Sequence, residues 1–379
     1  MIEMSKSKTL QIQDEIQKLG ERLGFISKIE EQLHSHEYYA PKYDVVWELD
    51  LEKQYNLSDI RKLFMNDVKL FERIKCFPFA GFEIEGSSTT SKNQLGNFAN
   101  LYSGNFLYNF VIVNNSEANG ENDTYRRGVK LKRYFSENSG DKNVFFFDKC
   151  HLEQSVDNLI DFDKELFYDS ENLEERGTYG GESESTVMLY EKIRTRFLMN
   201  SGLSFKQNYS PWLYDVKYQM AKEASGKILE PDFRTEDCFR HFYTGQVFYR
   251  EPLDTKAVRV KKLAESLYVP KLDICGGFNA PKGFTAWLKA LADVIGNNGV
   301  AHFPILYALQ RKMIEDLFVP LIGIEIEANV NKHLNGGIFN MAKNTYAGVV
   351  VTKEPALKHV EFYKKELGIK NITAYCLEE

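Results

Sequence analysis

The chain carries the same motif twice, and this repeat constrains the fold more than any other feature of the sequence. Residues 78–85 read Pro-Phe-Ala-Gly-Phe-Glu-Ile-Glu, and residues 320–327 read Pro-Leu-Ile-Gly-Ile-Glu-Ile-Glu, a displacement of 242 positions from Pro78 to Pro320. A Lys, a Gly and an Asn follow at matching intervals after both motifs. Because spacing and residue type agree together, we interpret the sequence as an internal duplication.

The similarity continues on both sides of the motif and in the same order. Matching pairs of segments are 39–45 with 268–274, 110–113 with 348–351, and 142–147 with 370–375. Two copies are too few for a solenoid. We therefore expect two similar domains related by a pseudo-two-fold axis, so that one polypeptide contains both halves of a dimer-like arrangement.

The length of 379 residues suits two or three domains, each able to bury a core of its own. We predict an N-terminal repeat at 1–150, a middle linking or DNA-recognition segment at 151–250 without a counterpart in the duplication, and a C-terminal repeat at 251–379. The net charge of −6 gives no overall signal for nucleic-acid binding, so any such function depends on local basic patches.

The five cysteines are scattered and show neither metal-ligand nor redox spacing, which favours free thiols in a reducing compartment. The N-terminus has no signal-peptide pattern, and no apolar run reaches membrane-spanning length. We expect a cytoplasmic protein with no membrane partner.

Apolar periodicity predicts an α/β fold in each repeat, with a central mixed sheet flanked by helices. In the first copy we expect helices at 9–34, 58–74 and 92–101, and strands at 43–49, at the Glu-Ile-Glu motif and at 106–113. In the second copy we expect helices at 255–267, 284–295, 305–317, 332–343 and 354–367, and strands at 272–274, 321–328, 348–352 and 371–376.

The Glu-Ile-Glu strands carry the chemistry of the repeat. Alternation along a strand places both Glu side chains on one face, and the neighbouring residues are apolar, so two acids point into a buried layer. Buried carboxylates need a cation or donors, and hard oxygen ligands suit Mg²⁺, with Mn²⁺ as a substitute. Asp44 and Asp273, on the preceding strands, are candidates for a third oxygen. The alternative is that Glu residues face solvent or pair with Lys92 or Lys332; persistence of all four residue types in both copies favours the metal site.

This constellation resembles the PD-(D/E)XK nucleases, a superfamily that includes many type II restriction endonucleases. The third motif position is Glu here, where that family most often has Lys. The resemblance implies two restriction-endonuclease-like domains with catalytic residues Asp44, Glu83, Glu85 and Lys92 in one copy and Asp273, Glu325, Glu327 and Lys332 in the other. It also implies Mg²⁺ ligation by Asp44 with Glu83 and by Asp273 with Glu325. Glu72 and Glu315, just before each strand, are alternatives to the two Asp residues.

The function implied by the resemblance is site-specific hydrolysis of double-stranded DNA, with one active site per strand in a chain that can act as a monomer. Candidate DNA contacts lie in two basic stretches: Arg126, Arg127, Lys130 and Lys132 in the first, and Arg194 and Arg196 in the second. A solvated surface strand explains the first stretch equally well. Alternative functions are a structure-specific repair or phage-defence nuclease acting on flaps, junctions or RNA, and a catalytically silent DNA-binding pseudo-dimer.

Overall fold

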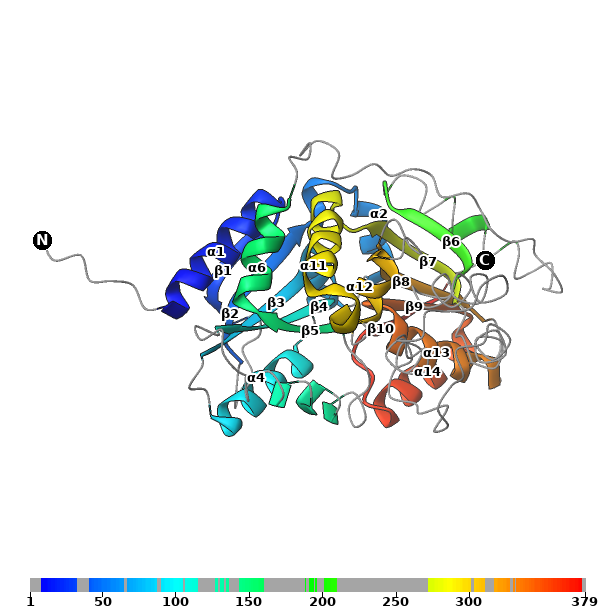
Figure 1. Ribbon diagram of the computed structural model, residues 1–379. Coiled ribbons are helices and arrows are strands. Elements are labelled where there is room, and N and C mark those ends of the chain that lie inside the picture. Colours follow the sequence, from blue (N-terminus) through cyan, green and yellow to red (C-terminus); the bar gives the residue numbers. More distant parts are fainter. Residues whose placement is uncertain are drawn as a thin grey trace, which may run out of the picture.

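The computed structural model contains two five-stranded mixed sheets flanked by helices, which makes the protein an α/β protein (Figure 1). The description that follows covers residues 8–32, 41–64, 67–86, 90–104, 106–114, 127–128, 130–132, 134–135, 143–159, 188, 191–193, 195, 201–209, 272–300, 303–310, 317–327, 330 and 332–376.

The first sheet has the strand order β1-β2-β3-β4-β5. Its strands are β1 (Ile26–Glu31), β2 (Tyr43–Asp50), β3 (Cys76–Gly86), β4 (Tyr108–Asn114) and β5 (Asn143–Asp148). The first three form an antiparallel meander, and β4 and β5 then run parallel to β3. Helix α1 (Lys8–Arg22) precedes the sheet, and helix α4 (Ser91–Ser103) crosses from β3 to β4.

The second sheet has the order β10-β9-β8-β7-β6 and repeats the same pairing pattern. Its strands are β6 (Ser204–Tyr209), β7 (Leu272–Asn279), β8 (Phe318–Ile326), β9 (Ala347–Thr352) and β10 (Ile372–Cys376). Strands β6, β7 and β8 are antiparallel, and β9 and β10 run parallel to β8. Helix α13 (Lys332–Asn344) connects β8 to β9, and α14 (Glu354–Glu366) connects β9 to β10. The two halves therefore share one strand topology, as a duplication requires.

The middle segment is not wholly without a counterpart. Strand β6 lies inside 151–250, pairs with β7 and occupies the place in the second sheet that β1 occupies in the first. The helix predicted at 255–267 lies outside the described residues.

The helix predicted at 9–34 is wrong in its second half. Helix α1 ends at Arg22, and Gly24 follows with a φ of 89°, the left-handed conformation that glycine adopts without strain. The Phe25 N–H bonds back to the Gly20 carbonyl at 2.9 Å and the Gly24 N–H to the Glu21 carbonyl at 3.1 Å, which is the Schellman pattern of helix termination. The chain then turns into β1, an edge strand that the sequence pattern missed.

The β2–β3 connection of the first repeat is not the single helix predicted at 58–74 but several short helices. It consists of η1 (Leu51–Lys53), α2 (Ser58–Arg61), η2 (Lys62–Phe64) and α3 (Val68–Lys75). The corresponding β7–β8 connection contains α11 (Lys282–Val300), kinked at Gly296, and α12 (Pro304–Gln310).

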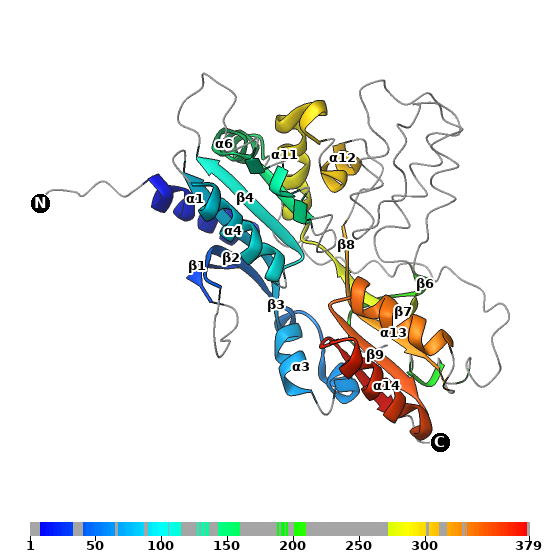
Figure 2. The same ribbon diagram turned by 90° about the horizontal axis from the view of Figure 1, so that it is seen from below.

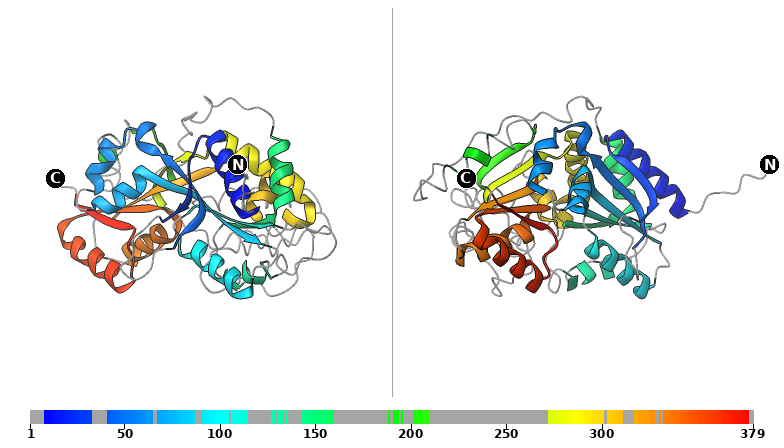
Figure 3. Two further views of the ribbon diagram at one scale, coloured as in Figure 1. Left: turned by 90° about the vertical axis from the view of Figure 1, so that its left-hand side faces the viewer. Right: turned by 180° about the vertical axis from the view of Figure 1, so that it is seen from behind.

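Each of these connections packs on the other repeat. Trp287 of α11 lies 5.5 Å, ring centre to ring centre, from Trp47 of β2, so α11 shares one face of the first sheet with α1 and with α6 (Lys149–Asp157), as Figure 3 shows. In the other direction, the Tyr346 hydroxyl donates to the Arg73 carbonyl of α3 at 3.3 Å, and α3 lies beside the second sheet in Figure 2. One continuous apolar core therefore includes residues of both sheets.

Among the described residues, none forms a helix both long enough and apolar enough to span a membrane.

Candidate functional site

Asp44, near the start of β2, lies against the acidic motif of β3. Its Oδ2 accepts the backbone N–H of Ile84 at 2.7 Å, and its Oδ1 accepts from the Gln13 side-chain amide of α1 at 3.0 Å. Ile84 separates the two Glu residues of the motif. The antiparallel register, which pairs Val45 with Phe82, sets Asp44 across from Glu83. The fold thus brings together an Asp and a Glu that are far apart in the sequence.

Glu83 and Glu85 are buried, with 4% and 0% of their surfaces exposed. Both lie on the sheet face that α4 covers, because Asn97 of α4 donates from Nδ2 to Glu85 Oε1 at 2.8 Å and the Asn100 side chain hydrogen-bonds to Glu83. The apolar neighbour Phe82 points to the opposite face, where its ring lies 4.4 Å from that of Trp47. Alternation along β3 therefore separates an acidic face from an apolar one, as the sequence predicted.

Burial dominates the electrostatics of this site. It raises the pKa of Glu83 to about 9, with the neighbouring Asp44 carboxylate as the next cause, and it also raises the pKa of Asp44 itself. Among the described residues, the main causes of the Glu83 pKa shift include no basic side chain. Glu83 therefore keeps its proton at pH 7 unless a cation takes the place of that proton.

The second repeat reproduces this arrangement. Asp273 of β7 accepts the N–H of Ile326 at 2.9 Å through Oδ2, and its own N–H lies 3.4 Å from Glu325 Oε1. Burial, and next the Asp273 carboxylate, raises the pKa of Glu325 well above its usual range. In both repeats, then, the Asp accepts the N–H between the two motif Glu residues and lies beside the first of them.

The two sites differ in the helix residue that faces the acids. The spacing of the repeat aligns Asn97 of α4 with Gly337 of α13. A Cβ atom at Gly337 would come within 2.9 Å of Glu325 Oε2, so the glycine allows that carboxylate to lie against the helix backbone. In the first repeat the helix offers a side-chain amide to Glu85 instead. The two sites are therefore alike in their acids and unlike in the helix residue that faces them.

The other predicted site residues lie in helices, just after a strand, or outside the described residues. Lys92 is exposed in the first turn of α4, and Glu72 is exposed on α3. Glu327 follows the end of β8 and stays on its ladder, with its N–H bonded to the Val351 carbonyl at 3.0 Å. Lys332 begins α13, and only its backbone is described. Glu315 lies outside the described residues.

The basic residues predicted to contact DNA divide into three groups. Arg126, Arg194 and Arg196 lie outside the described residues. Arg127 donates to Ser91 Oγ at 2.7 Å, in the first turn of α4, and Lys130 is exposed. Lys132 is a correction: it is only 6% exposed, and its Nζ lies 4.3 Å from the centre of the Phe303 ring, so it is not a surface phosphate contact. Residues 130–132 are helical, which also rules out the surface-strand interpretation there.

Sequence reasoning gave no role to Gln13, Asn97 or Asn100, although all three donate to the acidic residues. The recurrence of Asn100 as Asn340, at the same displacement as the lysines, was the available signal. Sequence reasoning also missed the cluster formed by Asp148, Cys150 and His151. In the described part of the chain, this is the group in which one ligand atom from each of three residues lies within 4.8 Å of the others. Asp44, Glu83 and Glu85 are less tightly clustered.

The first acidic site suits a hard divalent cation. Glu83 Oε1 is buried and has no hydrogen-bond partner in the described residues. An unpaired buried carboxylate oxygen is costly, and oxygen atoms are the ligands that Mg²⁺ and Mn²⁺ prefer. Asp44 and Glu83 would supply one carboxylate each. The donor set therefore fits a magnesium ion.

Comparisons of the chain with protein-family models, with curated proteins and with solved structures each gave no match.

Proposed function

We propose that the protein is a magnesium-dependent endonuclease of the PD-(D/E)XK type that hydrolyses both strands of double-stranded DNA at a specific sequence, with one active site in each repeat. The observation that carries the proposal is the hydrogen bond from the N–H of Ile84 to Asp44 and its counterpart from Ile326 to Asp273. This contact brings the Asp to the Glu-Ile-Glu strand twice, in two stretches of chain where most of the surrounding residues differ.

The order of elements around each site supports the same proposal. In the first repeat a helix precedes three antiparallel strands, the acids lie on the second and third strands, and a helix then leads to a parallel fourth strand. The second repeat has the same strand order, with its acids on the equivalent strands. This is the arrangement that the resemblance to PD-(D/E)XK nucleases implies for the catalytic core.

The acidic residues have distinct roles in this proposal. Asp44 with Glu83, and Asp273 with Glu325, hold the metal. When bound, Mg²⁺ supplies a Lewis acid that polarises the scissile phosphate and lowers the pKa of a water molecule. Glu85 orients the attacking water in the first site, with Asn97 fixing the carboxylate through its 2.8 Å hydrogen bond.

The end of α4 next to the first site suits a phosphate. Lys92 lies in the first turn of α4, and Arg127 bonds to Ser91 in the same turn. The N-terminus of a helix carries a partial positive charge, and its free N–H groups bind anions. A DNA backbone passing this end of α4 meets two cationic side chains and the helix dipole beside the carboxylates of β3.

The test is incubation of the purified full chain with long duplex DNA of mixed sequence, in Mg²⁺ and in EDTA. We expect discrete fragments with 5′ phosphates in Mg²⁺ and intact DNA in EDTA. Flap, junction and RNA substrates run in parallel separate the restriction function from a structure-specific nuclease. Glu72→Gln, which changes an exposed Glu on α3, serves as the control variant and should cut like the wild type. If all substrates stayed intact in both Mg²⁺ and Mn²⁺, the nuclease proposal would be wrong, and the catalytically silent DNA-binding alternative would remain.

A further inference from the structure

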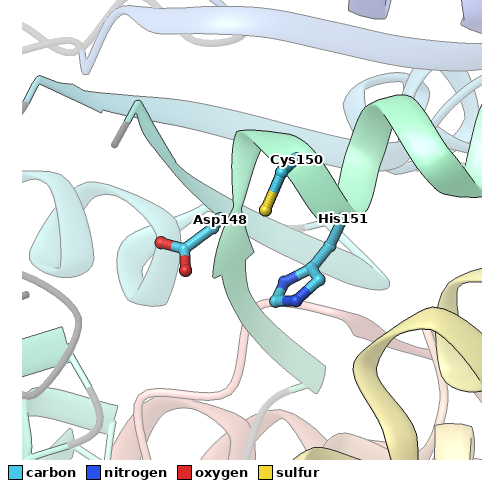
Figure 4. Close-up of side chains that lie close together, drawn as sticks. All are labelled: Asp148, Cys150 and His151. Atoms are coloured by element: carbon cyan, nitrogen blue, oxygen red, sulfur yellow. The ribbon is translucent and has the colours of Figure 1, made fainter. Parts of the chain in front are cut away.

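A second set of metal-ligand side chains lies at the junction of β5 and α6. Asp148 is the last residue of β5, and Cys150 and His151 lie in the first turn of α6. One ligand atom from each of the three residues lies within 4.8 Å of the other two. Figure 4 shows the three side chains gathered around the start of the helix. None of the three belongs to the acidic sites described above.

Two of these side chains present polar atoms that nothing in the described residues satisfies. Asp148 Oδ1 and His151 Nδ1 are both buried and have no hydrogen-bond partner. Asp148 occupies the N-cap position of α6, where an Asp ordinarily accepts a backbone N–H, yet its side chain makes no capping hydrogen bond. Leaving buried polar atoms unpaired is costly, so these two atoms call for a ligand.

We propose that Asp148, Cys150 and His151 bind a single zinc ion. A carboxylate oxygen, a thiolate sulfur and an imidazole nitrogen are the ligand types that Zn²⁺ takes in proteins, whereas a thiolate does not suit Mg²⁺. Three protein ligands leave one position of a tetrahedral site for water or another small ligand. Cys150 is exposed, so solvent reaches the site from its side.

The surroundings tolerate a cation. The nearest basic residue in the sequence, Lys149, forms ion pairs with Glu153 at 2.9 Å and Glu15 at 3.7 Å, so its charge is matched by two carboxylates. Asp148 shares a row of the sheet with Glu85, since both pair with Val113 of β4. Within this row, two strand spacings of about 5 Å each place Asp148 roughly 10 Å from Glu85, so the zinc site is distinct from the candidate magnesium site.

Cobalt titration of the purified full chain tests this assignment. Co²⁺ replaces Zn²⁺ in such sites, and a cobalt–thiolate bond produces a charge-transfer absorption in the near ultraviolet that carboxylate ligands do not produce. We expect this band to saturate at one equivalent of cobalt and to disappear when Zn²⁺ is added. His151→Ala and Asp148→Asn should each weaken cobalt binding by more than the roughly 10- to 100-fold that loss of an outer-shell partner costs.

Cys150→Ser and Cys76→Ser form a matched pair, since both replace an exposed free cysteine. The first should abolish the thiolate band and the second should preserve it, while both unfold like the wild type in EDTA. Glu83→Gln with Glu325→Gln should also preserve the band, which separates this site from the proposed nuclease sites. Absence of the band in the wild type, its survival in Cys150→Ser, or its loss in Cys76→Ser would overturn the proposal.

Discussion

Replacing Glu83 by Gln should stabilise the metal-free protein, and increasingly so as the pH rises. Gln keeps the shape of the side chain and removes the ionisable group. Burial raises the pKa of Glu83 to about 9, whereas an exposed Glu has a value near 4.5, so the folded protein holds a proton there that the unfolded chain releases. Between these two values, stability therefore falls as the pH rises.

The magnitude follows from this linkage. One proton bound only by the folded state changes the free energy of unfolding by about 1.4 kcal/mol per pH unit. From pH 6 to pH 8 the wild type should lose about 2.7 kcal/mol through Glu83, and Glu83→Gln should not. Asp44 lies beside Glu83 and its pKa is also raised, so this figure is the upper end of the expected difference.

Urea unfolding in EDTA at pH 6, 7 and 8 measures the effect as a change in midpoint at constant slope. Glu72→Gln is the control, since it removes an exposed Glu from α3 and should track the wild type at every pH. Saturating Mg²⁺ should reduce the pH dependence of the wild type, because the metal replaces the proton. A difference between Glu83→Gln and wild type that is the same at pH 6 and pH 8 would refute the reasoning, because it would mean that Glu83 is ionised in the folded protein.

Three further results are expected. Gly337→Ala should displace the Glu325 carboxylate and impair the second site, which a plasmid-nicking assay would measure. Gly336→Ala, with open space around its Cβ, should instead stabilise α13 by about 0.5–1 kcal/mol, which urea unfolding would measure. Mg²⁺ at about 100 times its dissociation constant should stabilise the wild type by about 2.7 kcal/mol in thermal unfolding, and Asp44→Asn should diminish this gain. Trp287→Ala should lower the free energy of unfolding by about 3–5 kcal/mol. It should lower the unfolding midpoint of both repeats together, which spectroscopic probes placed in each repeat would measure.

The sequence predicted the inner strands well because their signals are strong. Strands β3, β4, β8 and β9 are apolar runs buried on both faces, and duplication doubled each signal. The acidic face of β3 followed from simple alternation. The contact of Asp44 with Ile84 did not follow, since it depends on the register between β2 and β3, which a bulge at Trp47 and Glu48 shifts.

The outer strands were missed for a physical reason. Strand β1 is an edge strand with mostly half-exposed residues, and Ile26 and Ile29 are spaced as they would be in a continuing helix. Only Gly24 marked the end of α1. Strand β6 lies far from β7 in the sequence, so no local pattern linked them.

Packing between the repeats was also beyond the sequence pattern. The β2–β3 and β7–β8 connections have helical periodicity, but periodicity does not say which sheet a helix covers. The same limit explains the wrong prediction for Lys132. Its charge suggested a phosphate contact, but its Nζ lies against the Phe303 ring of the other repeat.

The central claim is that each repeat holds its own active site for one DNA strand, and nicking of supercoiled plasmid in Mg²⁺ tests it most directly. The wild type should give linear DNA, Glu83→Gln and Glu325→Gln should each stop at the nicked circle, and the double variant should leave the plasmid supercoiled. Each single variant should nick the opposite strand from the other, as strand-specific end labelling would show. Linear product from either single variant, or complete inactivity of one single variant alone, would contradict the account.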